Sequence, residues 1–417
     1  MPEFLTLLPP DEARALLLSH LSGPVANFES IDVASSLERV LAEDIRAPQP
    51  LPDFQRSTVD GYAVRARDTH GASDSLPAYL TLAGEVPMGD APDFEIRAGQ
   101  CALIHTGGML PEGSDAVVML EFTQRAQSNE IEILRAAAEA ENVIHVGEDV
   151  AQGQTVLAKG TRLRPAEIGG LSALGILKVR VARKPRVGLI STGDEVIDPS
   201  RSPRPGQVRD VNTYTLGALV EKAGGSARSY GIASDKFEAL KDVAAKALSE
   251  CDVVIITAGS SASTRDMTAE VIRWLGDPGV LVHGINTRPG KPTILGVCDG
   301  KAVIGLPGNP VSALVNGYLF VVPVIERLLG VLPQQKPRVL ARLTLNLPSQ
   351  AGREDWWPVK LVFDSPSGRG QGEGPLAEPI FGKSNLIFTL ASADGLLRIP
   401  PDATGLSTGE VVEVYLL

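Results

Sequence analysis

The feature that most constrains the fold lies between residues 184 and 330, where apolar runs alternate with amphipathic segments. The runs that predict strands are 186–191, 226–230, 251–257 and 301–306, and the segments that predict helices are 212–222, 235–249, 267–275 and 311–329. Strands that alternate with helices at this spacing form a mainly parallel sheet with helices on both faces. We therefore predict a doubly wound α/β domain over residues 183–330.

The rest of the chain has a different pattern of apolar and turn-forming residues. Residues 48–141 and 331–417 contain short strand-like runs between Gly, Pro and Asp turns, which is typical of small β-rich domains. Residues 1–47 and 142–182 contain helix-like segments, and we interpret them as one discontinuous linking domain of α/β type. The fold class predicted is therefore α/β multidomain, with four domains at these boundaries.

The charge of the chain argues against two classes of partner. It holds 39 Lys and Arg against 50 Asp and Glu, so its net charge is 39 − 50 = −11, and no run of five basic residues occurs. A nucleic-acid or membrane partner is unfavourable for such a chain. The apolar run Val253–Ala258 is far shorter than the ~20 residues of a membrane helix, and residues 1–4 lack the positive charge of a secretory signal. We predict a cytoplasmic protein.

Four loops of the α/β domain carry residues suited to a phosphorylated ligand. In open α/β sheets ligands bind at the carboxyl ends of the strands, where we expect these loops to meet. Their small residues let backbone N–H groups approach a phosphate closely. The loops are 191–195, 257–266, 288–292 and 305–312.

The side chains of these loops add charge and hydroxyl groups. Arg288 and Lys291 are cations in turns flanked by proline. Glu195, Asp235 and Asp266 could hold Mg²⁺ against a phosphate, because Mg²⁺ prefers oxygen ligands. The residues therefore predict a phosphorylated ligand bound with a metal, although neither a Walker A loop nor a dinucleotide fingerprint is present.

Each of these signals has a purely structural alternative. Asp235 heads the D-x-x-E form of a capping box, and Asp266 could be the N-cap of the helix expected after it. Residues 260–264 could form a surface loop, and 307–310 could be a helix entry with proline at the first position.

Taken together, the motifs resemble the molybdopterin molybdenumtransferase family, the molybdenum insertases, which are similar to the C-terminal domain of gephyrin. The motifs of the C-terminal half are Ile190-Ser-Thr-Gly-Asp-Glu195, Arg288-Pro-Gly-Lys-Pro292 and Gly305-Leu-Pro-Gly-Asn-Pro-Val-Ser-Ala313. Those of the N-terminal half are Arg56-Ser-Thr-Val-Asp-Gly-Tyr-Ala63, Ala83–Gly89, Ile104–Gly108, Asp115–Val118 with Glu121, and Gly147–Asp149. The resemblance runs from about residue 5 to 417.

The resemblance implies an activity, partners and a shape. Members of the family insert molybdenum from molybdate into adenylylated molybdopterin and release AMP with the help of Mg²⁺. The implied molecule is an elongated homodimer of four-domain subunits, in which the α/β domain binds the pterin. A molybdopterin adenylyltransferase is the implied partner that would supply the substrate.

The loops and the resemblance together select the candidate site residues. Asp60, Glu195, Asp235 and Asp266 are the catalytic candidates, and the last three are also the metal ligands. Asp60 and Thr106 belong to residues 48–141, so they could meet the α/β cleft only through folding or across a dimer interface. The substrate-binding candidates are Thr106, Asp149, Ser191, Thr192, Gly193, Ser260, Ser261, Ser263, Arg288, Lys291, Pro307, Gly308, Asn309, Pro310, Ser312, Arg353 and Ser384.

One loop departs from the family pattern S-G-G-V-S-V-G-x-x-D. In Thr257–Asp266, Ala258 and Ser263 replace two glycines, and Ser260 and Ala262 replace two valines. Fewer glycines restrict the backbone, whereas more hydroxyls favour an oxyanion. A tungstate-preferring insertase and a non-catalytic pterin-binding or scaffold protein therefore stay open as alternatives. The retained carboxylates favour an enzyme.

Overall fold

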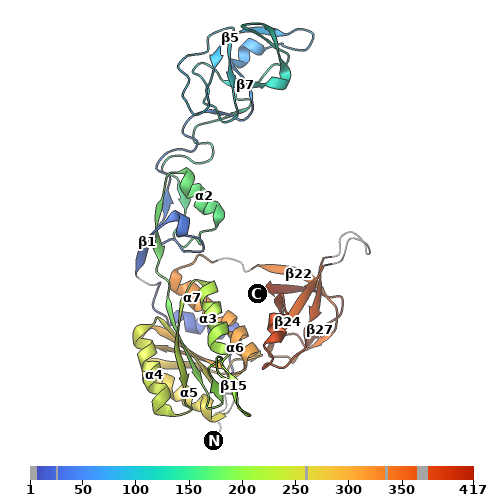
Figure 1. Cartoon of the computed structure of the whole chain (residues 1–417). Helices are drawn as coiled ribbons and strands as arrows, with labels where there is room; N and C mark the ends of the chain where they lie inside the picture. The colour runs from blue at the N-terminus through green and yellow to red at the C-terminus, as the bar shows by residue number, and fades with distance from the viewer. Residues whose placement is uncertain (1–6, 25–26, 259–261, 334–336, 364–373) are drawn as a thin grey trace.

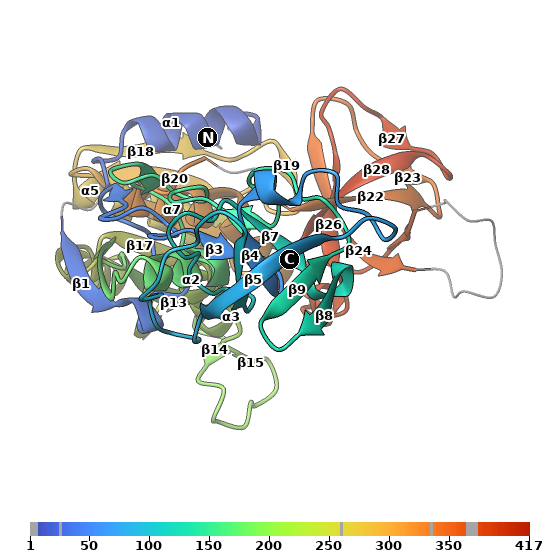
Figure 2. The ribbon, with the colours of Figure 1, turned by 90° about the horizontal axis from the view of Figure 1, so that it is seen from above.

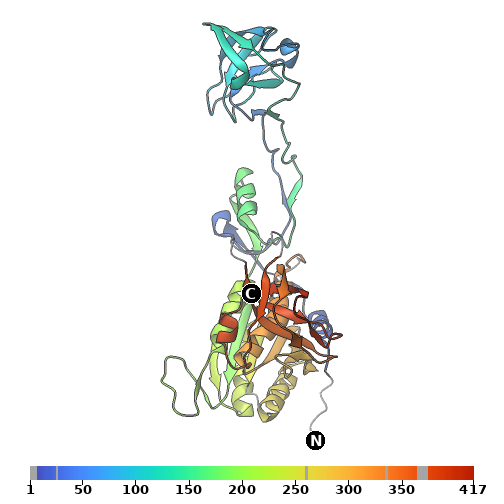
Figure 3. The same cartoon turned by 90° about the vertical axis from the view of Figure 1, so that its right-hand side faces the viewer.

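The structure is a computed structural model that describes residues 7–24, 27–258, 262–333, 337–363 and 374–417, with the backbone alone at 262–265. The molecule is elongated. Figures 1 and 3 show residues 48–141 at one end, a narrow linking region in the middle, and the α/β region with the C-terminal sheet beside it at the other end.

A sheet of strand order β16-β13-β17-β21-β20-β18 forms the centre of the α/β region. Its first four strands are parallel, whereas β20 and β18 run antiparallel. The predicted doubly wound α/β domain is confirmed, but the sequence analysis did not find β18 and β20. The strands are β13 (Arg186–Thr192), β16 (Ser226–Ala233), β17 (Val253–Ala258), β18 (Pro278–His283), β20 (Ile294–Cys298) and β21 (Lys301–Pro307).

Helices cover both faces of this sheet. One core joins α1, α3 and α7 to one face through residues such as Leu216 and Phe320, and another joins α4 and α5 to the other face through Leu240 and Ile272. All six residues of β17 are buried between these layers, as in other parallel sheets. The helices are α1 (Pro10–Ser19), α3 (Asn212–Ala223), α4 (Phe237–Glu250), α5 (Ala262–Leu275), α6 (Pro310–Asn316), a π-helical segment (Gly317–Val321) and α7 (Val322–Leu329).

The stretch Pro310–Leu329 is the one helix in the described ranges that is long and apolar enough to cross a membrane. Within its most apolar window, 67% is buried inside the protein. Its Val315, Phe320 and Ile325 belong to the core that covers the sheet. The stretch Pro310–Leu329 is therefore buried to the extent expected of a helix in the core of the protein.

The linking region consists of two passages of the chain that run side by side. Its paired strands are β1 (Phe28–Asp32) with β12 (Lys178–Ala182), β2 (Ile45–Arg46) with β11 (Thr155–Leu157), and β3 (Arg56–Ser57) with β10 (Val143–Ile144). Helix α2 (Pro165–Ala173) and a 3₁₀ helix (Val33–Ser35) pack beside them. The four domain boundaries stay predictions.

The distal region, residues 48–141, is built on a sheet of order β7-β4-β6-β5-β9-β8. Its elements are β4 (Gly61–Val64), β5 (Ala78–Glu85), β6 (Gln100–Ile104), β7 (Ala116–Met119), β8 (Thr123–Gln127), β9 (Glu130–Ile133) and the 3₁₀ helices Ala66–Thr69 and Leu120–Phe122. The region is thus β-rich.

The C-terminal region also forms a sheet, of order β19-β24-β25-β22-β28-β26. Strand β19 (Thr287–Arg288) comes from the α/β region, so this sheet is attached directly to one of the candidate loops. Figure 2 shows the sheet beside the α/β region, with the segment that contains the parallel pair β14–β15 projecting elsewhere. The remaining elements are β14 (Val196–Ile197), β15 (Val208–Arg209), β22 (Arg338–Leu343), β23 (Leu347–Pro348), β24 (Glu354–Val362), β25 (Leu376–Pro379), α8 (Phe388–Ala391), β26 (Gly395–Ile399), β27 (Gly405–Leu406) and β28 (Val411–Leu416).

Candidate functional site

The candidate loops meet at one edge of the central sheet. Strands β13, β17 and β21 are parallel and end at this edge. Loop 288–292 precedes β20, and it reaches the same edge because β20 is antiparallel to β21, with Ile294 opposite Gly305. Because β20 runs in the opposite direction to β13, β17 and β21, loop 288–292, which precedes β20, lies beside the loops that follow those three strands.

Two pockets open among these loops. The first has a volume of about 520 Å³, and we call it the carboxylate pocket because Glu195 and Asp210 line it. The side-chain hydroxyls of Ser191 and Thr213 donate hydrogen bonds to Oδ2 of Asp210 at 2.8 and 2.6 Å. The lining residues are Ser191, Thr192, Glu195, Val196, Pro203, Val208, Arg209, Asp210, Val211, Asn212, Thr257, Gly308, Asn309, Pro310 and Asn385.

Asp210 organises this pocket, although the sequence analysis did not select it. Its side chain is 7% exposed, and its Oδ1 accepts the backbone N–H of Thr213 at 3.1 Å, in the manner of a helix N-cap. Ser191 also lies 3.3 Å from Thr257, hydroxyl to hydroxyl. One buried carboxylate therefore fixes a set of hydroxyls contributed by three elements.

Two polar atoms near this pocket lack partners. Oγ1 of Thr192 and Oδ1 of Asn212 are buried and have no hydrogen bond within the described part of the chain. The amide nitrogen of Asn212 donates to the carbonyl of Gly308 at 2.9 Å, so its orientation is fixed. Buried polar atoms are nearly always hydrogen-bonded in folded proteins, and these atoms are therefore candidate contacts for a ligand.

Asp235 lies among other carboxylates. Burial raises its pKa, and the negative charges of Asp194 and Glu195 raise it further. Its Oδ1 is buried without a hydrogen-bond partner in the described residues. Helix α4 begins at Phe237, so the alternative of a capping box formed by Asp235 is wrong.

These carboxylates fit a Mg²⁺ ion that is shared with a substrate. The described residues contain no group of three His, Cys, Asp or Glu side chains arranged to hold a metal alone. Mg²⁺ is commonly held by one or two carboxylates together with phosphate oxygens, and an ion would relieve the repulsion around Asp235.

Asp266 lies inside α5, which begins at Ala262, so its alternative role as an N-cap is wrong. Its side chain is exposed.

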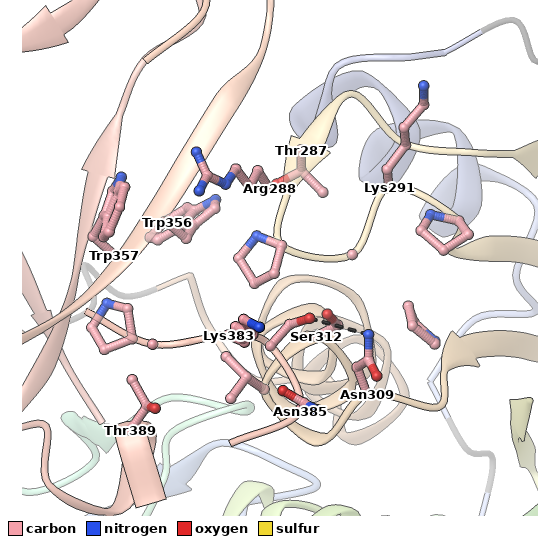
Figure 4. A pocket seen from close by; sticks show the side chains of 18 of the residues that line it. Thr287, Arg288, Lys291, Asn309, Ser312, Trp356, Trp357, Lys383, Asn385 and Thr389 are labelled. Atoms are coloured by element: carbon pink, nitrogen blue, oxygen red, sulfur yellow. Dashed lines mark hydrogen bonds between the residues drawn. The ribbon is translucent and has the colours of Figure 1, made fainter. Parts of the chain in front are cut away.

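The second pocket has a volume of about 710 Å³ and lies between the α/β region and the C-terminal sheet. Among the described residues, its lining contains four basic side chains and no acidic one, although the whole chain carries a net charge of −11. We call it the anion pocket (Figure 4). The lining residues are Thr287, Arg288, Pro289, Gly290, Lys291, Pro292, Pro307, Asn309, Val311, Ser312, Arg353, Trp356, Trp357, Pro358, Ile380, Gly382, Lys383, Ser384, Asn385 and Thr389.

The two pockets adjoin, because Asn309 and Asn385 line both. The amide nitrogen of Asn309 donates to the hydroxyl of Ser384 at 3.1 Å, and the N–H of Val311 donates to the carbonyl of Ser384 at 3.0 Å. Pro310 is at the first turn of α6, so the helix-entry alternative for 307–310 is correct and coexists with the site. The β21–α6 turn thus joins the C-terminal region to both pockets.

Loop 288–292 packs closely on α6. The amide nitrogen of Asn316 donates to the carbonyl of Pro289 at 3.1 Å. Gly290 has φ of +102°, and a Cβ atom there would lie 1.7 Å from that nitrogen. Only glycine fits this position. Figure 4 shows Arg288 beside the two tryptophans, whereas the side chain of Lys291 extends away from Ser312.

The candidates in the N-terminal half form a separate group. Oδ1 of Asp60 accepts the backbone N–H and the hydroxyl of Thr106 at 2.7 and 3.2 Å. These bonds, with a smaller effect of His105, lower the pKa of Asp60. Asp149 is exposed in the linking region. In one subunit this group lies far from both pockets, as Figure 1 shows for the distal region.

Some candidates cannot be placed, and some residues of the site were missed. Ser260 and Ser261 lie outside the described residues, and only the backbone of Ser263 is described. Asp210 could have been found from its position two residues before a predicted helix. The adjacent pair Trp356 and Trp357, which lines the anion pocket, was a second sequence signal for the site. Asn212, Lys383 and Asn385 gave no sequence signal.

Three family models match the chain in order. They are the MoeA N-terminal region (domain I and II) at 8–175, the probable molybdopterin binding domain at 188–327, and the MoeA C-terminal region (domain IV) at 340–417. A molybdopterin molybdenumtransferase of Haemophilus influenzae is 32% identical over 97% of both chains. The chain belongs to the molybdopterin molybdenumtransferase family.

Other relatives agree with this membership. A molybdopterin molybdenumtransferase of Nostoc sp. is 34% identical over 93% of this chain and 88% of the relative. A crystal structure of a molybdopterin biosynthesis MoeA protein from Pyrococcus horikoshii OT3 is 34% identical, with a TM-score of 0.85 over 99% of this chain and 100% of that one. The resemblance predicted from the motifs is confirmed over the whole chain.

Proposed function

We propose that this protein is a molybdenum insertase, which transfers molybdenum from molybdate to adenylylated molybdopterin and releases AMP. The observation that supports the proposal most is the contact between two pockets of opposite character. A pocket whose described charged side chains are all basic suits a doubly charged oxyanion, and the adjoining pocket offers hydroxyls and carboxylates to a pterin and its phosphates. Asn309 and Asn385 are the shared wall across which the two substrates would meet.

The residues of the two pockets would have different roles. In the carboxylate pocket, Ser191, Thr192 and Asn212 would bind and orient the phosphorylated pterin through their hydroxyl and amide groups. Glu195 and Asp235 would hold Mg²⁺, which when bound neutralises the charge of the phosphoanhydride. In the anion pocket, Arg353, Ser312 and Ser384 would hold molybdate. Asp266 stays a catalytic candidate on the adjacent helix α5.

A homodimer would complete this site. Asp60 and Thr106 form an exposed, preorganised pair at the far end of the subunit, and neither is among the described residues that line the carboxylate pocket or the anion pocket. An isologous dimer could bring the pair of one subunit to the cleft of the other. Asp149 would lie on the same shared surface.

Subunit mixing tests this arrangement. Asp60→Ala and Glu195→Gln homodimers are each expected to be inactive, because every site lacks one group. Equal co-expression should restore about a quarter of wild-type turnover, because about half of the dimers are mixed and each mixed dimer has one intact site. A monomer by light scattering, or no restored turnover in mixed dimers, would contradict the shared site.

The proposal also covers the setting of the reaction. The substrate is an adenylylated pterin, so an adenylyltransferase must supply it, and such an enzyme is the proposed partner. A cytoplasmic location is proposed from family membership and from the acidic composition of the chain. The proposal includes no nucleic-acid or membrane partner.

The test is to measure AMP release and metal incorporation together. Purified protein is mixed with adenylylated molybdopterin, Mg²⁺ and either molybdate or tungstate, and EDTA provides the metal-free control. AMP release matched by metallated cofactor supports the insertase, and the ratio between the two oxyanions shows which one is preferred. Tight pterin binding without AMP release would instead identify a scaffold protein.

A further inference from the structure

Asp355 is a fully buried carboxylate directly behind the anion pocket. It lies on β24, opposite Arg288 in the parallel pairing of β19 with β24. Its oxygens accept hydrogen bonds from Nε and Nη2 of Arg353 at 2.7 and 3.0 Å, and Nη1 of Arg288 lies 3.8 Å from Oδ2. Both arginines line the pocket, whereas Asp355 does not belong to its described lining.

This arrangement fixes the orientation of Arg353. Two parallel N–H···O bonds hold the plane of the guanidinium, which a single bond would leave free to rotate. One further N–H group, at Nη1 of Arg353, donates to Oε1 of Gln350 at 3.5 Å, and the remaining N–H groups at Nη1 and Nη2 are available at the pocket wall. Arg288 is placed in a second way, because its guanidinium lies 5.2 Å from the ring centre of Trp357.

A buried ion pair of this kind is a poor source of stability, because desolvation of the two charges offsets most of their attraction. Its effect on orientation is a more direct consequence of the geometry. Guanidinium N–H groups in a fixed plane match the oxygens of a tetrahedral oxyanion, whereas mobile ones lose conformational entropy when they bind.

We propose that Asp355 is a positioning residue that holds Arg353 and Arg288 as a preorganised pair of donors for the oxyanion substrate. The inference rests on the proposed function, in which molybdate binds in the anion pocket. Asp355 acts through the arginines and does not touch the substrate.

The substitution Asp355→Asn separates this role from simple electrostatics, because the two effects have opposite signs. Removal of a negative charge near the pocket raises the local positive potential, which would tighten the binding of an anion. Loss of one acceptor oxygen breaks the bidentate pair and frees the guanidinium, which would weaken binding. The proposal predicts that the second effect dominates.

The experiment is a calorimetric titration of the intact protein with molybdate, with thermal unfolding as the folding control. For Asp355→Asn we expect a dissociation constant that is higher on the order of tenfold, as for the loss of one charge-assisted contact. The matched control is Glu354→Gln, a neighbouring carboxylate on β24 that is 2% exposed and bonded to Arg398 and Trp356 at 2.8 and 2.7 Å. Its dissociation constant should change by less than about twofold, because glutamine keeps an acceptor for Trp356.

A double-mutant cycle tests whether Asp355 acts through Arg353. In the Arg353→Ala background, Asp355→Asn should cause a clearly smaller loss of molybdate affinity than in the wild type, because only Arg288 is left for Asp355 to position. If Asp355→Asn does not fold, Arg353→Lys takes its place, because lysine keeps the charge but cannot form the planar pair, and it should also weaken binding on the order of tenfold.

Several results would overturn the inference. They are tighter or unchanged molybdate binding in folded Asp355→Asn, an additive loss in the double variant, or unchanged binding in Arg353→Lys. If the wild-type protein binds no molybdate, the oxyanion pocket of the proposed function fails as well. Normal wild-type binding with an unaffected Asp355→Asn variant would remove the positioning role alone.

Discussion

The carboxylate pocket and the anion pocket share a wall but are built in different ways. The carboxylate pocket is formed mostly by the ends of neighbouring parallel strands and the start of α3 in the α/β region, and the C-terminal region contributes Asn385. The anion pocket needs the C-terminal sheet, because Arg353, Trp356 and Lys383 come from residues beyond 350. The α/β region therefore supplies nearly all of the first pocket, whereas the second depends on the pairing of β19 with β24.

The largest expected effect is in the carboxylate pocket. Glu195→Gln removes a charge that we assign to metal and phosphate chemistry, and we expect turnover to fall by about 10²–10³-fold, as for the loss of one electrostatic stabiliser. Molybdate affinity should stay within about twofold, because Glu195 does not line the anion pocket. Turnover measured by AMP release, beside a molybdate titration, checks both parts. Turnover close to that of the wild type would remove Glu195 from the chemistry.

The next effect is in the anion pocket. Arg353→Ala should raise the molybdate dissociation constant by about 10–100-fold, because a charge-assisted hydrogen bond contributes about 1.5–3 kcal/mol. Turnover at saturating molybdate should change much less. Arg338→Ala is the control, since Arg338 also pairs with a carboxylate of the C-terminal sheet, Glu413, but both side chains are over 40% exposed. Equal losses in the two variants would contradict the anion pocket.

A smaller effect concerns the stability of the carboxylate pocket. Asp210→Asn places an amide group where Ser191 and Thr213 now donate hydrogen bonds, and we expect a loss of about 1–2 kcal/mol in the free energy of unfolding. Asp198→Asn should cost less, because Asp198 is an exposed residue of the loop between β14 and β15 that accepts bonds from Ser200. Urea denaturation measures both. A loss at Asp198 equal to that at Asp210 would mean that burial of the hydroxyl cluster contributes nothing.

The smallest effect is a dependence of stability on pH. The pKa of Asp235 is raised in the folded state, so its contribution to stability is present at low pH and is lost as the pH rises through the raised pKa. Asp235→Asn should therefore unfold at a higher temperature than the wild type at neutral pH, with no advantage near pH ~3. Thermal unfolding as a function of pH is the measurement.

Asp60→Asn provides a comparison in which the pH dependence of stability has the opposite sign. The hydrogen bonds of Thr106 lower the pKa of Asp60, so its contribution to stability is present at neutral pH and is lost as the pH falls through the lowered value. The asparagine variant should be less stable than the wild type at neutral pH, and the difference should vanish in acid. Shifts of the same sign in both variants would contradict these assignments.

The sequence predicts the α/β region well because hydrophobic periodicity is a local signal. The strands β13, β16, β17 and β21 lie where the apolar runs predict them. Strands β18 and β20 were missed because a Gly- and Pro-rich segment around them hides the pattern. Helix α5 begins at Ala262, earlier than predicted, because the motif loop itself continues into the helix.

The site was predicted only where motif residues lie on one sheet edge. Ser191, Glu195, Asn309 and Pro310 could be grouped because parallel strands end together. Asp355 and Lys383 could not be grouped with Arg288, because their proximity depends on tertiary pairing between distant segments of the chain. Asp60 and Thr106 flank β4 and β6 of the distal sheet, so within one subunit they lie far from the cleft, and their meeting with it across a dimer interface stays a prediction.

The two adjoining pockets are proposed to hold different substrates. The most direct test measures kcat and the KM for molybdate in Glu195→Gln and in Arg353→Ala, at saturating adenylylated molybdopterin and Mg²⁺. We expect opposite patterns: Glu195→Gln lowers kcat with little change in the KM for molybdate, and Arg353→Ala raises that KM with little change in kcat. The same kinetic change in both variants would contradict the proposal that the pterin and molybdate bind in separate pockets.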